Sequence, residues 1–213
     1  MGSCMSASSS PTVVSDVPNP TVKFETTMGT FEAELYLGEL PMTVSSFIDL
    51  VQKNFYDGIH FHRVIKNFML QFGCPYAKDH ESPQAGTGGP APRSTYKNLV
   101  TGAEVKRDGG GNIRDEHTSK RSNEPGTLSM ANTGAANSGG SQFFVNTVHN
   151  DFLDWFSPGD SKHPVFGKVT SGMDVVQAIE GVSTNSSDRP REPVKMISVT
   201  VSNLPAPQAE ETR

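Results

Sequence analysis

One arginine stands in an apolar stretch of the chain where a permanently charged donor could do chemistry. Residues 61–71 read FHRVIKNFMLQ, with Arg63 on one strand-like run and with Met69 and Gln71 sharing a face of the next. An arginine that faces a core is costly unless it is paired. Arg63 therefore faces either a groove beside Met69 and Gln71 or the solvent over a half-buried sheet. The strand pattern alone leaves both open.

A second stretch pairs an amide with apolar residues in the same way. Residues 126–147 read GTLSMANTGAANSGGSQFFVNT, which predicts two strands around a loop of small residues. In the second of these strands Gln142 and Phe144 share one face, while Phe143 and Val145 take the other.

Residues for covalent or metal chemistry are not arranged in the required patterns. Gly139-Gly140-Ser141 lacks the spacing of a nucleophile elbow, and the six His and two Cys show no metal-ligand spacing, so no metal and no cofactor are expected. Phe61, Arg63 and Ile65 are expected on one face of their strand and His62 on the other. His62 is therefore predicted to be a buried histidine with its hydrogen bonds satisfied, and not a base.

Five motifs, in order along the chain, together resemble the cyclophilins, which are peptidyl-prolyl cis-trans isomerases. They are FHRVI-x-x-FMLQ-x-G, GTGG, SMANTG, GGSQFFV and HPVFGKV, and the resemblance covers about residues 20–204. It implies a mainly β fold, a closed antiparallel barrel capped by two α-helices. It also implies an enzyme that isomerises X–Pro bonds of peptides and client proteins and so assists protein folding.

Prolyl isomerisation needs no nucleophile, metal ion or catalytic base. Its barrier of about 18–20 kcal/mol is amide resonance, and no bond breaks. A donor aimed at the prolyl nitrogen stabilises the twisted state more than the planar one. Arg63 carries five donors and suits this role, and the resemblance implies that Gln71 holds its side chain.

The resemblance also implies the residues that bind substrate. Phe68, Met69, Phe144 and Leu153 would hold the proline ring, with His163 at the rim; Ala131, Asn132, Thr133 and Gln142 would line a groove that grips the peptide backbone, with Gly86 at its border. Taken singly, Phe68, Phe144 and Leu153 would be read as ordinary core residues.

Two positions depart from the family pattern. Thr133 stands where Ala is more common, and Phe152 stands where Trp is more common. Cyclophilins are the receptors of cyclosporin, and Phe lacks the indole donor that Trp offers. We therefore expect cyclosporin binding to be possible but weakened.

Hydrophobic periodicity predicts the elements around these motifs. We expect a hairpin over residues 21–37, a helix that begins at Pro41, a strand over 165–169, a helix over 173–180 and a last strand over 195–201. The isomerase domain is expected over residues 21–204, with surface inserts at about 90–112 and 154–162. A disordered arm (1–20) and a loose tail (205–213) would flank it.

Composition limits the classes of partner that the protein can bind and indicates its cellular compartment. A net charge of −5 with scattered Lys and Arg argues against nucleic-acid binding, and the expectation is a monomer. No apolar run approaches a membrane span, and Cys4 and Cys74 form no disulfide framework. A reducing compartment, the cytosol or the nucleus, is therefore the default, and the protein is expected to be cytoplasmic.

The first residues, MGSCMS, match a myristoylation pattern at Gly2, with Cys4 placed for a second acyl chain. One chain gives only marginal membrane binding, so Cys4 would matter to an anchor. The pattern is short, and an unmodified or vector-derived tail explains it equally well. Membrane association is expected only through this acylated N-terminus.

Two other functions remain open beside the enzyme. One is a proline-peptide binding or scaffolding module whose turnover is incidental, although binding alone would not require Arg63 and Gln71. The other is a barrel with a ligand in its interior, which the large residues Phe24, Phe31, Phe47 and Phe143 disfavour, because they predict a filled core.

Overall fold

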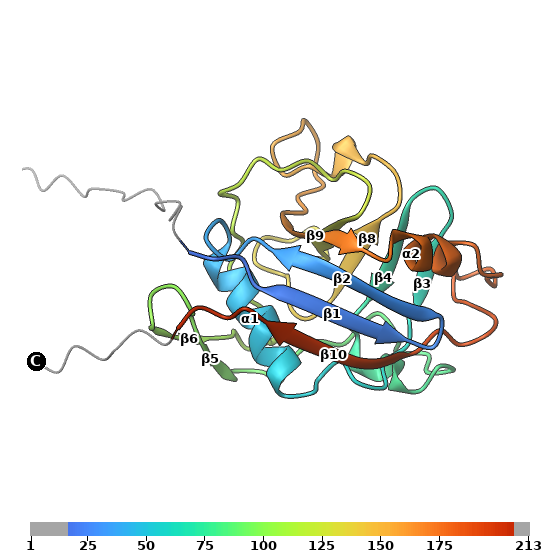
Figure 1. Cartoon of the computed structure of the whole chain (residues 1–213), viewed down its shortest axis with the longest axis horizontal. Helices are drawn as coiled ribbons and strands as arrows, with labels where there is room; N and C mark the ends of the chain where they lie inside the picture. Colours follow the sequence, from blue (N-terminus) through green and yellow to red (C-terminus); the bar gives the residue numbers. More distant parts are fainter. Residues whose placement is uncertain (1–16, 207–213) are drawn as a thin grey trace, which may run out of the picture.

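The computed structural model describes residues 17–206, so the predictions on Gly2 and Cys4 lie outside the described residues. A strongly curled antiparallel sheet of eight strands forms most of the molecule (Figure 1). Its strands, in chain order, are β1 (Thr21–Thr26), β2 (Gly29–Leu35), β3 (Arg63–Ile65), β4 (Met69–Phe72), β7 (Thr127–Met130), β8 (Phe143–Asn146), β9 (Val165–Ser171) and β10 (Met196–Ser202).

Two α-helices cover the two ends of the curled sheet, α1 (Pro41–Gln52) and α2 (Met173–Glu180) (Figure 1). Proline lies in the first turn of α1, where its missing N–H costs nothing. The carboxylate of Glu116 accepts hydrogen bonds from two other first-turn amides, Met42 N at 2.9 Å and Thr43 N at 2.6 Å. The predicted hairpin, both helices and the last two strands are therefore present, with boundaries shifted by two residues or fewer.

The interior of the sheet is filled by aromatic rings. Phe24, Phe31, Phe47 and Phe143 are at most 3% exposed. Phe24 stacks on Phe31 with ring centroids 4.6 Å apart, and Phe47 meets Phe143 edge-on at 5.6 Å. This packing agrees with the predicted filled core and leaves no room for a ligand-holding interior.

The expectation of a closed barrel is wrong. The strand order is β10-β1-β2-β9-β7-β8-β4-β3, so β10 and β3 are unpaired edges and the sheet is a half-barrel. The gap is crossed by one isolated antiparallel bridge, between His60 and Lys195, and by a few backbone hydrogen bonds, such as Met196 N to Ile59 O at 2.8 Å and Phe61 N to Val194 O at 2.9 Å. The segment before β3 is irregular, with a φ of +80° at Gly58, and it forms this isolated bridge instead of a continuous strand.

Because of the same irregular backbone, the prediction that Phe61 shares a strand face with Arg63 and Ile65 is wrong. Strand β3 begins only at Arg63, so Phe61 does not share the face of Arg63 and packs instead in the main core.

The segment 90–112, expected to be a surface loop, contains a short hairpin. Its strands are β5 (Thr95–Lys97) and β6 (Glu104–Lys106), and the hairpin lies beside α1 (Figure 1). Two short 3₁₀ turns, η1 (Pro75–Lys78) and η2 (Asp151–Leu153), complete the elements.

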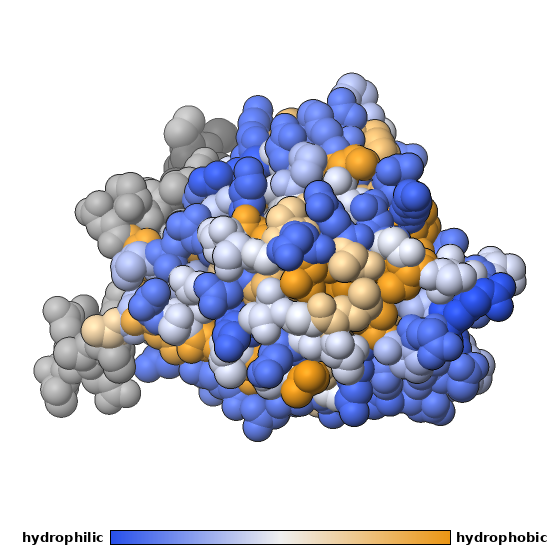
Figure 2. All heavy atoms as spheres, turned by 45° about the vertical axis from the view of Figure 1, so that its right-hand side comes forward, coloured by the Kyte–Doolittle hydropathy of each residue, from blue (hydrophilic) through white to orange (hydrophobic). Residues whose placement is uncertain are grey.

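No helix within residues 17–206 is long and apolar enough to cross a membrane. Figure 2 shows one face of the surface, where apolar side chains form a limited area bordered by hydrophilic ones. Patches of this kind are normal on folded proteins, so the surface by itself points to no partner.

Candidate active site

A small apolar cluster lies apart from the main core, on the other face of β4 and β8. Met69, Phe144 and Leu153 are its buried members, and Ile65, Phe68 and Ala131 pack at its edge. Side chains alternate along a strand, so Leu70 and Phe72 of β4 enter the main core while Met69 and Gln71 face the other way. The cluster brings together the four residues predicted to hold a proline ring.

Arg63 lies at the edge of this cluster. It pairs with Gln71 across β3 and β4, and Ile65 pairs with Met69 in the same ladder. The Arg63 Nη1 is 3.5 Å from Gln71 Oε1, and its Nε is 3.7 Å from Asp188 Oδ2. The Arg63 side chain is 43% exposed, so the guanidinium keeps free donors that can reach a bound ligand.

Hydrogen bonds between side-chain amides hold Gln71 in place. Gln71 Nε2 donates to Gln142 Oε1 at 3.0 Å, and Gln142 Nε2 donates to the carbonyls of Gly86 and Gly88, each at 2.9 Å. Gly86 adopts a φ of +93°, which favours glycine. The order Arg63–Gln71–Gln142–Gly86 therefore links residues from three separate motifs.

A groove of about 360 Å³ extends from this amide chain. Its lining includes Gln71, Gly86, Ala131, Asn132, Thr133 and Gln142, all of them expected site residues. The segment 90–112 also contributes Gly110 and Asn112, which sequence reasoning missed. The turn of three glycines at 109–111 was a signal for a tight backbone approach, but nothing in it indicated where the turn would dock.

Aromatic rings form one wall of the apolar cluster. Phe152, on η2, stacks on Phe68 with centroids 6.0 Å apart and is 56% exposed. The nearby Trp155 does not join this wall, because it stacks on His117 and its Nε1 donates to Ser119 O at 2.7 Å. The wall around Phe152 therefore has no indole donor from Trp155.

His163 lies at the rim, with its ring edge-on to Phe144 at 5.3 Å. Its Nδ1 is 2.8 Å from the carbonyl of Met130, so the neutral ring carries its proton on Nδ1. Burial lowers the pKa of His163, and the hydrogen bond to Met130 opposes that shift. The ring is neutral at pH 7 and presents an apolar face to the cluster.

His62 is buried as expected, but the prediction that its hydrogen bonds are satisfied is wrong. Neither ring nitrogen has a hydrogen-bond partner among the described residues, and the ring lies under the backbone of Gly86. Burial, and secondarily the positive charges of Arg63 and Arg189, lower the pKa of His62 to about 4, with weak opposition from the Gln142 amide.

The site holds donors and apolar surface but no nucleophile–base pair. Residues 17–206 contain no cluster of His, Cys, Asp or Glu that could hold a metal ion. What the arrangement can do is bind an apolar ring on the cluster, hold an extended chain in the groove, and direct the Arg63 donors at their junction.

Comparison with known proteins agrees with this geometry. A family model described as cyclophilin type peptidyl-prolyl cis-trans isomerase/CLD matches residues 21–201. The peptidyl-prolyl cis-trans isomerase CYP71 of Arabidopsis thaliana is 42% identical over 181 residues, which are 84% of this chain but only 24% of that protein. A peptidyl-prolyl cis-trans isomerase of Acinetobacter baylyi is 35% identical, with 87% of each chain covered.

Solved structures show the same fold. A cyclophilin type peptidyl-prolyl cis-trans isomerase of Cryptosporidium parvum superposes with a TM-score of 0.69 at 23% identity, covering 88% of this chain and 99% of the other. A second structure of that protein was solved in the presence of the dipeptide Ala-Pro. With the family model matching most of its length, the chain belongs to the cyclophilin-type peptidyl-prolyl cis-trans isomerases, a family of isomerase enzymes.

Proposed function

We propose that this chain isomerises X–Pro bonds of peptides and client proteins without a covalent intermediate, using Arg63 as the catalytic donor. The β3–β4 register carries the proposal. It sets Arg63 opposite Gln71 and Ile65 opposite Met69, so the donor and the apolar cluster occupy one face of two adjacent strands.

The mechanism follows from amide electronics. As the X–Pro bond twists, resonance is lost and the lone pair localises on the prolyl nitrogen. A guanidinium N–H directed at that nitrogen forms a hydrogen bond that the planar ground state cannot form, and such an interaction raises kcat. Gln71, itself held by Gln142, would restrict the Arg63 side chain to this orientation.

The seat for the substrate has two parts. Met69, Phe144 and Leu153 would receive the proline ring, with Phe152 stacked on Phe68 as the outer wall. The groove along Ala131, Asn132 and Thr133 would grip the neighbouring backbone. Binding the ring while the flanking residues rotate leaves the twisting bond beside Arg63.

The test is a protease-free isomerisation assay on an X–Pro peptide with Arg63→Ala and Arg63→Lys. Arg63→Ala should lower kcat/KM by about a hundredfold, or roughly 2.7 kcal/mol, because the transition-state donor is lost. Arg63→Lys should recover only part of this, since an ammonium keeps the charge without the planar fork. Unfolding curves check that both variants fold. Near-wild-type turnover by folded Arg63→Ala would exclude the donor mechanism.

The same assay separates the enzyme from a binding module. A wild-type protein that binds the X–Pro peptide, detected by calorimetry, without accelerating its isomerisation would be a scaffold. The donor–amide chain from Arg63 to Gln142 favours the enzyme, because binding an apolar ring does not require it.

We further propose that the protein is cytoplasmic and is acylated at Gly2 and Cys4, from the pattern MGSCMS. In a eukaryotic cell part of the wild-type protein should fractionate with membranes. Gly2→Ala should release it, and Cys4→Ser should weaken retention because one acyl chain is marginal. Equal distribution of wild type and Gly2→Ala would refute the anchor.

A further inference from the structure

A second cavity, of about 490 Å³, lies where the segment 90–112 meets the end of α1. It shares no lining residue with the groove. We call it the α1 cavity. Its volume falls within the roughly 300–1,000 Å³ of typical ligand pockets.

The α1 cavity combines apolar walls with cations. Apolar surface comes from Leu50, Phe55, Pro75 and Pro90, and positive charge comes from Lys53, Lys78 and Arg107; no acidic side chain lines it. A pocket with this lining suits a ligand that has a large apolar group beside a negative charge.

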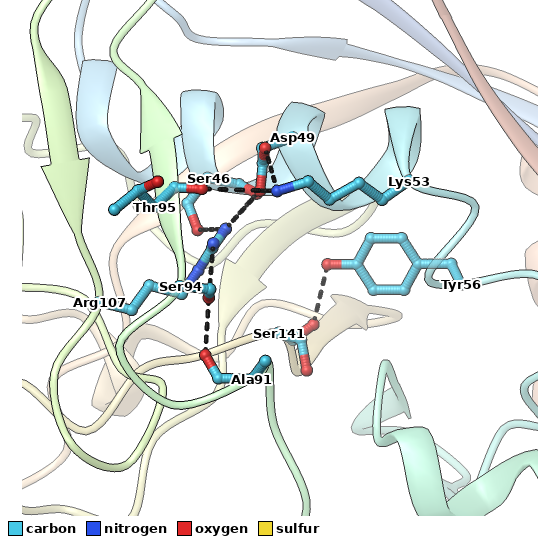
Figure 3. A network of polar contacts seen from close by, with 9 residues as sticks. All are labelled: Ser46, Asp49, Lys53, Tyr56, Ala91, Ser94, Thr95, Arg107 and Ser141. Carbon is cyan, nitrogen blue, oxygen red and sulfur yellow. Dashed lines mark hydrogen bonds and ion pairs between the residues drawn. The ribbon is translucent and has the colours of Figure 1, made fainter.

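Arg107 is 1% exposed and is held on three sides (Figure 3). Its Nη2 donates to Ser46 Oγ at 2.9 Å and to Asp49 Oδ2 at 3.0 Å, and its Nη1 donates to Ser94 Oγ at 3.2 Å. Its guanidinium also lies over the Tyr96 ring at 4.7 Å. The Arg107 Nε, however, has no partner among the described residues, which is costly for a buried donor.

The cations of the cavity outnumber their carboxylate partners. Asp49 is paired with Arg107 and also with Lys53, whose Nζ is 2.8 Å from Asp49 Oδ1. Lys78 is exposed and has no hydrogen bond or ion pair to its side chain among residues 17–206. Asp79, the next residue, uses its carboxylate for the amide of Glu81. Arg107 and Lys53 therefore share one carboxylate, that of Asp49, and Lys78 has none.

The partial negative charge at the C-terminal end of α1 does not cancel the excess of cations in the cavity. A helix C-terminus carries about half a negative charge. Backbone N–H groups already occupy its last carbonyls, with Lys53 N bonded to Asp49 O and Phe55 N bonded to Leu50 O. The side chains that line the cavity therefore carry a net positive charge.

We propose that the α1 cavity binds an acidic peptide segment in which a large apolar side chain adjoins a carboxylate. The apolar side chain packs between Leu50, Phe55 and Pro75, and the carboxylate pairs with Lys78 and Lys53 at the rim. Lys53, Lys78 and Ala91 are exposed there, so a peptide chain can leave the cavity at its rim. A simple inorganic anion would leave the apolar walls unused.

The first experiment measures binding of a fluorescent peptide, Ac-Ala-Phe-Glu-Phe-Asp-Ala-NH₂, by polarisation at low salt. It contains no proline, so the proposed proline site is not its target. The matched probe Ac-Ala-Phe-Gln-Phe-Asn-Ala-NH₂ keeps the shape and removes both charges. We expect saturable binding of the acidic peptide only, and weaker binding at higher salt.

Variants then locate the site. Lys53→Gln/Lys78→Gln should weaken binding of the acidic peptide about five- to twentyfold, because two exposed ion pairs with the peptide carboxylates are lost. Lys168→Gln is the matched control, since Lys168 is an exposed lysine on β9 that lines neither cavity. Amide chemical shifts of Asn54, Ala91 and Ser94 should move on titration, while those of Thr133 and Gln142 should not.

Three results would overturn the proposal. They are equal binding of the charged and the amide peptides, unchanged affinity in the double lysine variant, and displacement of the peptide by inorganic phosphate alone at millimolar concentration. Isomerase activity of the double lysine variant should equal that of wild type, because neither lysine touches the groove. Loss of that activity would mean that the variant perturbs the fold, and Lys53→Arg/Lys78→Arg should then restore both activity and peptide binding.

Discussion

Phe143 and Phe144 are neighbours on β8 and serve two different regions of the molecule. Phe143 is 2% exposed in the main core, where its ring contacts those of Phe47, Phe72 and Phe166 at 5.6–5.9 Å. Phe144 is 5% exposed and belongs to the small cluster with Met69 and Leu153. Exposure hardly separates the two residues, but their neighbours do.

The difference shows how one sheet provides both a stable body and a binding surface. Alternation along β4 and β8 divides the aromatic and aliphatic residues between two faces. The inner face packs against the other aromatic and aliphatic residues of the main core. The outer cluster has few members and an exposed wall at Phe152, so an apolar ligand can complete its packing.

The largest effect on stability should come from replacing Phe143 or Phe144 with alanine. Phe143→Ala should cost about 3–5 kcal/mol of the free energy of unfolding, because a cavity opens in a close-packed core. Phe144→Ala should cost less, about 1.5–3 kcal/mol, because its site can admit solvent and only the transfer energy is lost. Urea unfolding measures both.

Activity should show the opposite order. Phe144→Ala, where folded, should lose most isomerase activity, and the milder Phe143→Leu should keep it. If Phe144→Ala retained wild-type turnover, the cluster would be only a minor core and not a substrate seat.

Much of this arrangement could be predicted from local patterns. Alternation on FMLQF and SQFFV placed Gln71 with Met69 and Gln142 with Phe144, and the order of five motifs indicated that these runs meet. The open edge of the half-barrel could not be predicted, because strand-like alternation continues through residues 58–62 whereas the backbone there forms only an isolated bridge, between His60 and Lys195.

Other contacts are set by tertiary docking alone. Arg107 belongs to segment 90–112, which was expected to be a surface insert, yet the hairpin of this segment places its side chain against Ser46 and Asp49 of α1. Asp188 likewise reaches Arg63 only because the loop before β10 passes β3. Neither contact has a local sequence signal.

The next prediction concerns the wall of the outer cluster. Phe152 stacks on Phe68 and has no indole N–H to donate. The indole N–H of Trp155 donates to the backbone carbonyl of Ser119. Phe152→Trp should tighten cyclosporin binding about tenfold to hundredfold, since an unsatisfied ligand carbonyl costs about 1–3 kcal/mol. Calorimetry measures the affinity, and peptide turnover should change little. Equal affinity for both proteins would show that the wall needs no donor.

A smaller effect should appear in the pH dependence of stability, through His62. Its pKa falls from an ordinary 6.5 to about 4 in the folded protein, so the unfolded chain binds the proton first. The contribution of His62 is complete above pH 6.5 and is lost as the pH falls from 6.5 towards 4. At pH 5.5 the loss should be about 1 kcal/mol.

Urea unfolding of wild type and His62→Gln at pH 7.5 and 5.5 measures this loss. Wild type should lose more stability than the variant, which retains only the smaller contributions of histidines such as His163, whose pKa is also lowered. Equal losses would show that His62 is solvated or paired in solution.

The smallest effect should come from Asp188, which touches the donor and not the cluster. Its Oδ2 lies 3.7 Å from Arg63 Nε, and the two side chains are 45% and 43% exposed. Exposed pairs contribute about 0–1 kcal/mol, so Asp188→Asn should raise kcat/KM by at most about fivefold as the guanidinium is released towards substrate. Asn suits the test because Asp188 has a φ of +60°, a conformation that Asn tolerates.

Salt provides the control for this last prediction. Added salt screens the pair, so wild-type kcat/KM should rise towards that of Asp188→Asn, which should itself respond little. The backbone carbonyl of Asp188 still accepts the N–H of Val64, and the loop should remain in place. A tenfold fall in Asp188→Asn would mean that Asp188 holds Arg63 in its productive orientation, and the donor would then be positioned from two sides instead of by Gln71 alone.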